Sequence, residues 1–340
     1  MKTFVNYSLK SHNTFGIDAR CKQFVEYENI EELCEVLQHL RDTEHGGFLH
    51  IGGGSNLLFT KDYPGTILHS AIMGKECLSE NENEIFLRVG SGENWDDLVA
   101  WCVDNGYYGM ENLSYIPGEV GASAVQNIGA YGKEVCEFID SVETIEIATG
   151  HVKVFQVNDC HYAYRFSTFK AENKGKYIVT HVVYHLSKTF IPDLKYAALS
   201  RELERRHIAV ATISAKSLRD LVVDVRKSKL PETSELGSAG SFFMNPVVHE
   251  TVANSLLQRY PDMPHYEVEG GVKVPAGWLI EQSGWKGKRM GNVGVYEKQA
   301  LVLVNFGGAT GEDICRLSSM VQQDVKNKFG ISIYPEVNFI

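Results

Sequence analysis

The most restrictive feature of the sequence is the segment 116–132, which is rich in Gly, Ala and Ser and has little periodicity. Ile116, Val120, Val125 and Ile128 interrupt it, so a solvated surface loop is the weaker interpretation. A buried loop of this length leaves many backbone donors and acceptors in need of partners. A ligand that offers both kinds of group, such as a flavin with its pyrophosphate, would satisfy them.

A second glycine-rich segment, Gly52-Gly53-Gly54-Ser55-Asn56, lies between two apolar stretches. Glycines without a Cβ allow backbone N–H groups to converge on a phosphate. For three glycines alone, a plain turn between two strands is the better interpretation. The Rossmann fingerprint is broken, because Leu57 stands where its third glycine belongs, and the sequence contains no P-loop motif.

Apolar periodicity predicts both helices and strands in a chain of 340 residues, a length that indicates two or three domains. Helices are expected from Ile30 to a stop at Gly46 and Gly47, from Trp95 to before Gly106, and over 199–206, 217–225, 251–259 and 312–329. Strands are expected over 48–51, 142–147, 177–186 and 300–305, and in the alternating tail 331–339. This mixture indicates an α+β or α/β fold. Pro, Gly and Ser within 229–241 indicate a domain boundary.

The charge balance argues against some classes of function. With 33 basic and 43 acidic residues the formal charge is −10, and phosphate neutralisation in nucleic acid or anionic membranes needs clustered Lys and Arg. We expect no secretory signal after Met1 and no membrane span. The seven cysteines are scattered without a Cys-x-x-Cys pair, which indicates reduced thiols in the cytoplasm. His181 and His185 would lie about 13 Å apart on a strand, so we expect no metal site.

Three short segments contain candidate catalytic side chains, and each also has a simpler structural interpretation. Arg165 lies among aromatic residues; it either packs its stem on the rings, which the sequence favours, or binds a carboxylate through paired N–H donors. Ser241 follows a glycine and precedes Phe242, so it is either a hinge residue or a proton donor in a cleft. Glu336 is either a solvated terminal acid or part of a strand tied into a sheet.

Together these segments resemble the UDP-N-acetylenolpyruvoylglucosamine reductase family over nearly the whole chain. The landmarks, each weak alone but specific in this order, are Asn13-Thr-Phe-Gly16, Gly53-Gly54-Ser55-Asn56, Ile116-Pro-Gly118, Gln126-Asn-Ile-Gly-Ala-Tyr-Gly132, Tyr164-Arg165, Lys229-Leu-Pro231, Ala239-Gly-Ser-Phe-Phe243 and Pro335-Glu-Val337. The resemblance implies an α+β fold, with an FAD-binding unit of the vanillyl-alcohol-oxidase (PCMH) type and a C-terminal α+β substrate-binding domain. The expected parts are FAD subdomain 1 at 1–70 joined by the C-terminal strand 331–340, FAD subdomain 2 at 71–228, and the substrate domain at 229–330.

The resemblance also implies roles for individual residues. Arg165, Ser241 and Glu336 would be catalytic. FAD would contact Gly53, Gly54, Ser55, Asn56, Pro117, Gly118, Gly121, Ser123, Ile128, Gly129 and Tyr131, without a covalent link because neither loop contains His or Cys. The UDP-sugar would contact Tyr196, Lys229, Asn245, Tyr266, Lys286 and Gln299, with Tyr266 on a loop that covers the substrate. Ala122 stands where a serine is expected, so one hydrogen bond near the flavin is expected to be missing.

The implied reaction is the reduction of UDP-N-acetylglucosamine-enolpyruvate to UDP-N-acetylmuramate in peptidoglycan precursor synthesis, with a hydride passing from NADPH to FAD and then to the substrate. Arg165 and a protonated Glu336 would offset the developing charge, and Ser241 would protonate the neighbouring carbon. Two alternatives stay open. One is an oxidase or dehydrogenase of the same fold that needs no NADPH, and the other is a flavin-binding module without catalysis. No obligate protein partner is expected.

Overall fold

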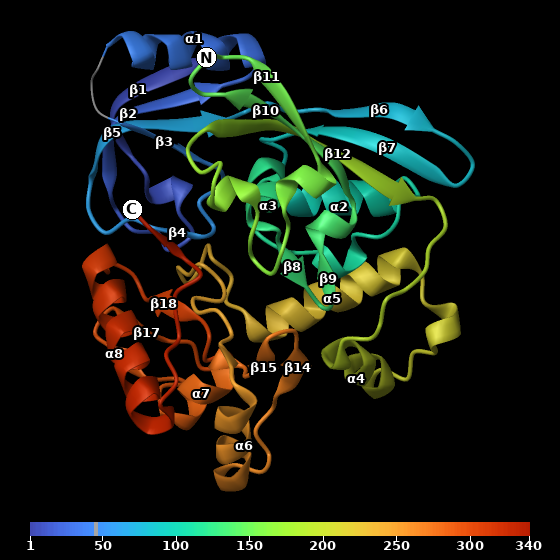
Figure 1. Ribbon diagram of the computed structural model, residues 1–340, viewed down its shortest axis with the longest axis vertical. Coiled ribbons are helices and arrows are strands. Elements are labelled where there is room, and N and C mark those ends of the chain that lie inside the picture. The colour runs from blue at the N-terminus through green and yellow to red at the C-terminus, as the bar shows by residue number, and fades with distance from the viewer. Residues whose placement is uncertain (44–46) are drawn as a thin grey trace. The chain divides into compact units, whose positions relative to one another are not determined.

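The computed structural model describes residues 1–43 and 47–340, and the chain forms two compact units (Figure 1). Unit 1 consists of Met1–Tyr7, Cys21–Gly53 and Pro64–Arg226, and unit 2 of Ser8–Arg20, Gly54–Tyr63 and Lys227–Ile340. Each unit therefore contains segments that lie far apart in the sequence. The three-part division expected from the resemblance stays a prediction.

The larger sheet of unit 1 is antiparallel throughout. Its strand order is β11 (Val152–Gln156), β10 (Ile139–Glu146), β12 (Tyr177–Ser187), β7 (Glu84–Gly90) and β6 (Lys75–Glu80). Val182 lies opposite Val142 on one side and Val89 on the other, and all three side chains are fully buried. This row of β-branched residues forms the floor of a core. The strands predicted at 142–147 and 177–186 are confirmed as β10 and β12.

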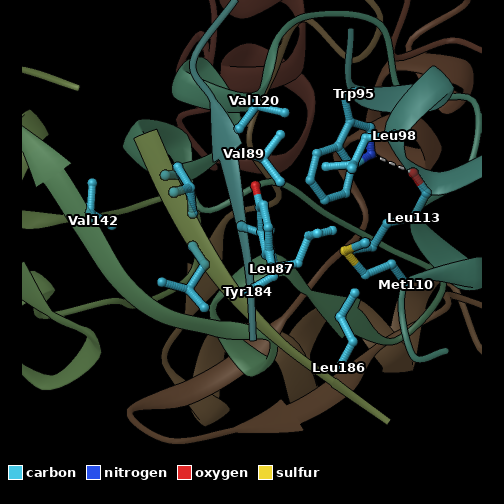
Figure 2. Packing of buried hydrophobic residues seen from close by; sticks show 14 of the residues in the cluster. Leu87, Val89, Trp95, Leu98, Met110, Leu113, Val120, Val142, Tyr184 and Leu186 are labelled. Carbon is cyan, nitrogen blue, oxygen red and sulfur yellow. Dashed lines mark hydrogen bonds between the residues drawn. The ribbon is translucent and has the colours of Figure 1, made fainter. Parts of the chain in front are cut away.

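Two helices, α2 (Trp95–Asp104) and α3 (Val120–Gln126), pack on this sheet in unit 1 (Figures 1 and 2). Figure 2 shows the Trp95 indole beside Leu98, and its Nε1 donates a 2.8 Å hydrogen bond to the Leu113 carbonyl. The Asn94 side chain caps α2, which confirms the helix predicted at Trp95. Helix α3 corrects the prediction for this segment, because the sequence indicated only a loop there. Small residues such as Gly121 conceal its helical period.

The second sheet of unit 1 is smaller and mixed. It has the order β1 (Lys2–Ser8), β2 (Arg20–Tyr27), β5 (Tyr63–Ser70) and β3 (Phe48–Ile51), with β3 and β5 parallel. Helix α1 (Ile30–Asp42) lies along one face of this sheet and buries Leu33 and Leu37 against Val25 and Leu68 (Figure 1). The predicted helix and the strand at 48–51 are confirmed. The helix ends at Asp42, with Thr43 as its C-cap, which is earlier than the predicted stop at Gly46 and Gly47; Gly46 itself lies outside the described residues.

Unit 1 also contains a short hairpin and a helix pair. The hairpin is β8 (Gly129–Ala130) with β9 (Lys133–Glu134). Helix α4 (Ala197–Arg205) contributes Leu199 and Leu203, and α5 (Ala215–Lys229), which lies in unit 1 as far as Arg226, contributes Leu218 and Val222, to one buried cluster. The helices predicted at 199–206 and 217–225 are therefore confirmed, and the apolar residues that predicted them form their common core.

Unit 2 combines three helices with short strands, among the residues that the structure describes. The helices are α6 (Glu250–Arg259), α7 (Ala276–Gln282) and α8 (Gly311–Phe329). The ladders are β13 (Val247–Val248), β15 (Gly271–Lys273) and β14 (Tyr266–Val268); β16 (Arg289–Met290), β17 (Val293–Val295) and β18 (Leu303–Asn305); and β19 (Asn338–Phe339) with β4 (Leu57–Leu58). Helix α8 begins at a Thr310–Asp313 capping box and ends at Gly330, with φ of 73°.

The elements of unit 2 agree with the predicted pattern at four places. The helices predicted at 251–259 and 312–329 are α6 and α8, and the strand predicted at 300–305 is the shorter β18. The tail is tied into a parallel ladder, since β19 pairs with β4. Over residues 1–43 and 47–340, no helix is both long enough and apolar enough to cross a membrane.

Candidate functional site

The two glycine-rich segments predicted to bind a flavin meet within unit 1. A Cβ added at Gly53 would lie 3.5 Å from the Cα of Gly118, so backbone faces backbone at this point. Gly118 is fixed because its carbonyl accepts a 3.0 Å hydrogen bond from the N–H of Trp95 at the start of α2. Two residues without side chains therefore leave bare main chain next to each other, which is the surface that a phosphate or a flavin ring needs for close approach.

The remaining residues of the first loop belong to unit 2. Gly54 has a φ of 65°, and a Cβ there would overlap the carbonyl of His12, so this glycine is required by the fold itself. Ser55 and Asn56 are half-buried. The Asn56 carbonyl accepts a 3.0 Å bond from the N–H of Asn338, and its amide donates a 3.3 Å bond to the Glu336 carbonyl. The loop predicted to hold pyrophosphate is therefore tied to the tail that contains the predicted catalytic acid.

The segment predicted as one long loop is partly helical, and this changes what two of its residues can do. The Ser123 hydroxyl lies in α3, is buried, and donates a 2.7 Å bond to the Val120 carbonyl, so it is already used within the protein. A Cβ at Gly121 would lie 2.8 Å from the Cβ of Ser91, so this glycine allows α3 to pack closely. The predicted cofactor contacts of both residues stay predictions. Ala122 lies beside Gly52, since a Cβ added at Gly52 would lie 3.2 Å from the Cβ of Ala122.

Arg165 lies at the tip of a tight turn in unit 1. Ala163 and Phe166 exchange two backbone hydrogen bonds, of 3.1 and 2.9 Å, and close a two-residue turn in which Arg165 has a φ of 56°. Its Nη2 donates a 2.7 Å bond to the Gly129 carbonyl, and Nη1 lies 3.5 Å from the Asn127 carbonyl. The structure therefore brings the predicted catalytic arginine to the segment predicted to face the flavin ring.

Several non-glycine residues near Arg165 have a strained, left-handed backbone conformation. Tyr115, Asn127, Tyr131 and Arg165 all have φ between 47° and 60°, which costs a residue with a side chain about 1–2 kcal/mol. Hydrogen bonds hold the conformation of Asn127, whose amide donates to Glu134 Oε2 at 2.8 Å. Left-handed non-glycine residues cluster at functional sites, where the surrounding fold maintains the strain.

Two aromatic rings join the predicted cofactor segment to the predicted substrate residues. Tyr131 and Tyr196 pack edge to face, with ring centroids 5.4 Å apart. Arg226, on α5, bonds the Tyr131 side chain and donates from Nε to the Tyr115 carbonyl at 2.9 Å. Burial lowers the pKa of the Arg226 guanidinium. The sequence interpretation missed Arg226; the only available signal is its position three residues before Lys229, on the same face of a helix.

In unit 2, backbone pairing places Ser241 close to Glu336, although 94 residues separate them. The Glu336 N–H donates to the Phe242 carbonyl at 2.8 Å, and Phe243 lies opposite Pro335. Ser241 itself lies opposite Val302. The Phe242 and Phe243 side chains that follow are both buried, whereas Ser241 is exposed. Two of the three predicted catalytic residues therefore lie on adjacent extended segments.

The predicted substrate residues of unit 2 are partly gathered at the start of α7. The Asn245 Oδ1 accepts a 2.9 Å bond from the Ala276 N–H, and a Cβ at Gly277 would lie 3.1 Å from Gln299 Oε1. Tyr266 begins β14 opposite Lys273, and its side chain is 59% exposed.

The two predicted lysines differ in their surroundings. Lys286 Nζ forms a 2.9 Å ion pair with Glu281 Oε1, which a diphosphate would have to displace. Lys229 is exposed at the end of α5. Among residues 1–43 and 47–340, no three His, Cys, Asp or Glu side chains could jointly hold a metal ion.

Comparison with known proteins identifies relatives along the whole chain. A family model described as the UDP-N-acetylenolpyruvoylglucosamine reductase C-terminal domain matches residues 231–340, and an FAD binding domain model matches residues 21–156. The chain is 51% identical to the UDP-N-acetylenolpyruvoylglucosamine reductase of Bacteroides fragilis, over 98% of this chain and 99% of the relative. It is 48% identical to that of Porphyromonas gingivalis, over 98% of both chains. The crystal structure of the reductase from Thermus caldophilus, 22% identical, shares the fold with a TM-score of 0.68 over 99% of this chain and 98% of that chain.

Proposed function

The chain belongs to the UDP-N-acetylenolpyruvoylglucosamine reductase family, and from this premise we propose that Arg165, Ser241 and Glu336 carry its reaction beside a bound FAD. The protein is an FAD-dependent oxidoreductase of peptidoglycan precursor synthesis. It reduces the enolpyruvyl ether of UDP-N-acetylglucosamine-enolpyruvate to UDP-N-acetylmuramate. FAD supplies, when bound, the hydride for the methylene carbon of the ether, and we propose NADPH as the source of that hydride. The observation that carries the proposal is the pairing of the extended segments that contain Ser241 and Glu336.

The residues of unit 1 fit a flavin. Gly53 and Gly118 present bare main chain to one another, and the hydrogen-bonded Gly129 carries no side chain against Arg165, where a Cβ would come within 3.0 Å of Nη1. We propose that this surface, with Pro117, Ile128 and Tyr131, holds the ring system, and that Gly53 to Asn56 hold the pyrophosphate. Gly121 and Ser123 would contribute through the backbone of α3.

Each proposed catalytic side chain has a separate task. The Arg165 guanidinium offsets the negative charge that develops next to the substrate carboxylate, because paired N–H donors match a carboxylate. Glu336, in its protonated form, donates one further hydrogen bond to the same charge. Ser241 donates its proton to the carbon beside the ether oxygen as general acid. A hydroxyl is a weak acid, so this role requires a strongly basic carbon.

We propose two groups of substrate-binding residues. In unit 1, Tyr196 beside Tyr131 offers a ring edge and a hydroxyl for the sugar. In unit 2, Asn245 and Gln299 offer amides near the start of α7, Lys229 and Lys286 offer charge for the diphosphate, and Tyr266 offers an exposed ring.

We also propose that the protein is cytoplasmic, because all seven cysteines are free thiols, which suits a reducing compartment.

A substitution at Ser241 tests the proposal because it separates the two half-reactions. Ser241→Ala should leave the reduction of bound flavin by NADPH nearly unchanged and slow its reoxidation by the enolpyruvyl substrate by about 10²–10⁴-fold. Stopped-flow absorbance at the flavin band measures both steps. Ser234→Ala, an exposed serine in the same segment, is the matched control and should leave both rates unchanged. Equal losses in the two half-reactions would remove Ser241 from the role of proton donor.

A further inference from the structure

A chain of three ionisable side chains crosses the smaller sheet of unit 1 and ends at the first glycine loop. His69, at the end of β5, lies between two carboxylates: its Nδ1 is 3.3 Å from Glu26 Oε2 and its Nε2 is 2.9 Å from Glu119 Oε1. The side chains of His69 and Glu119 are only 13% and 14% exposed. Lys2 binds the other oxygen of Glu26 at 2.8 Å. None of these four residues takes part in the proposed reaction.

Glu119 ends this chain against the two glycines of unit 1. A Cβ added at Gly52 would lie 3.2 Å from Glu119 Oε2, and one at Gly53 would lie 3.5 Å from Glu119 Oε1. The backbone of Glu119 is fixed as well, because its carbonyl accepts a 2.9 Å bond from the Ser123 N–H of α3. The glycines therefore make room for a carboxylate as well as for a ligand.

The charges around His69 favour its protonated form. The titratable and charged groups around it are Glu26 on β2, His50 on β3 and Glu119 before α3, with Tyr27 of β2 beyond His50 and Lys2 of β1 beyond Glu26. Burial lowers the pKa of His69, but the hydrogen bonds and charges of Glu119 and Glu26 outweigh burial and raise it above the ordinary value. His50 takes the opposite state, since burial lowers its pKa to about 3 and it bonds the Tyr27 hydroxyl at 2.7 Å.

We propose that Glu119 is a cofactor-binding residue that accepts a hydrogen bond from a hydroxyl of FAD lying on Gly52 and Gly53, and that His69, held by Glu26, positions it and neutralises its charge. The inference rests on the placement of FAD in the proposed function. A carboxylate only accepts hydrogen bonds, so it can bind a hydroxyl but would repel the diphosphate nearby. The protonated imidazole balances that repulsion. The hydroxyl belongs either to the ribose or to the ribityl chain.

Affinity of the apoprotein for FAD tests the proposal without any measurement of turnover. Glu119→Gln should weaken FAD binding by about 10- to 100-fold, because the uncharged amide that replaces the carboxylate is a weaker hydrogen-bond acceptor. Glu143→Gln is the matched control: Glu143 is also a partly buried carboxylate between a histidine and a cation, His181 at 3.6 Å and Arg88 at 2.7 Å, and should leave FAD affinity unchanged. Unchanged or tighter binding in Glu119→Gln overturns the inference, since tighter binding would show that the carboxylate only repels.

Two measurements on the wild type decide the matter even if a variant does not fold. Deoxy-FAD analogues, each lacking one hydroxyl of the ribose or of the ribityl chain, should include one that binds about 10- to 100-fold more weakly, and that analogue identifies the hydroxyl. If no analogue binds more weakly, the inference is overturned. FAD affinity should also fall as pH rises through the pKa of His69, because the anion then faces an unbalanced carboxylate; a flat pH profile in wild type contradicts the role of His69.

The variants also separate this inference from the proposed function. His69→Gln should flatten the pH profile of FAD affinity, whereas a merely structural histidine would leave that profile as in wild type. If the Glu119→Gln apoprotein binds FAD as well as the wild type does, the inference fails, yet both proteins would still bleach with NADPH and recolour with the enolpyruvyl substrate. A protein without any affinity for FAD would instead refute the proposed function itself.

Discussion

Alanine substitutions at Gly53 and Gly54, two neighbouring glycines of the first loop, should impair different properties of the protein. Gly54→Ala places a side chain at a φ of 65°, which costs about 1–2 kcal/mol, and forces the His12 carbonyl to move, which costs about 1–3 kcal/mol more. We therefore expect this substitution to lower the free energy of unfolding of the apoprotein by about 2–5 kcal/mol. At Gly53 the added Cβ meets its neighbours at 3.5 Å or more, an ordinary contact, so stability should change by less than about 1 kcal/mol.

The effect on the cofactor should follow the opposite order. The methyl group added in Gly53→Ala lies between this residue and Gly118, on the main-chain surface proposed for FAD, and should weaken FAD binding by about tenfold or more. Urea unfolding of the apoproteins and titration with FAD measure the two effects. Gly16→Ala is the matched control for backbone strain, because Gly16 has the same φ of 65° and no neighbour within 4 Å of an added Cβ.

The comparison of the three variants can refute the argument. Gly16→Ala should lose only the strain of about 1–2 kcal/mol, so that its difference from Gly54→Ala gives the cost of the overlap with His12. If Gly53→Ala is destabilised as strongly as Gly54→Ala, the described backbone contacts are wrong. If Gly53→Ala binds FAD with wild-type affinity, the surface between Gly53 and Gly118 does not hold the cofactor.

Two further predictions concern the stability of unit 1. Burial lowers the pKa of His50 to about 3, so the unfolded chain binds a proton below about pH 6.5 that the folded chain does not, and stability falls as pH falls. His50→Gln should remove up to about 1.4 kcal/mol of that loss per pH unit, and equal acid slopes in urea unfolding of the two proteins would contradict the buried neutral state. Leu87→Ala removes a side chain that is 1% exposed in the core of Figure 2 and should cost about 2–5 kcal/mol in the same assay, whereas a loss below about 1 kcal/mol would contradict tight packing.

The sequence predicted the regular elements best where packing follows the period of the chain. Helix α8 carries apolar residues at helical spacing, a capping box at Thr310 and a glycine at position 330, so local preference and burial agree. Helix α3 fails this test, because only Val120 and Ala124 supply fully buried apolar side chains and Gly121 packs by being small. Close packing of small residues leaves no periodic signal, which is why the segment was expected to be a loop.

Contacts between distant segments could be predicted only through the family resemblance. Nothing in the residues around Ser241 indicates that its strand pairs with the one that contains Glu336, since both are short extended segments without a helical period. The same holds for Arg165 and Gly129, which a turn and a hairpin bring together. The pair of His69 and Glu119 was not predicted at all, because neither the residues alone nor the family landmarks indicated which carboxylate a strand histidine would meet.

The way each functional side chain is held determines what a substitution can reveal. Ser241 is positioned by its neighbour, because Phe242 bonds Leu301 through its N–H and Glu336 through its carbonyl while its ring fills the core. Removing the Ser241 hydroxyl therefore removes chemistry and leaves the backbone in place. Glu119 is held differently, through its own carboxylate on His69. A change at Glu119 must alter both the charge and the position of the group, which is why its role has to be measured by binding of defined cofactor analogues, whereas the role of Ser241 can be measured by the rates of two half-reactions.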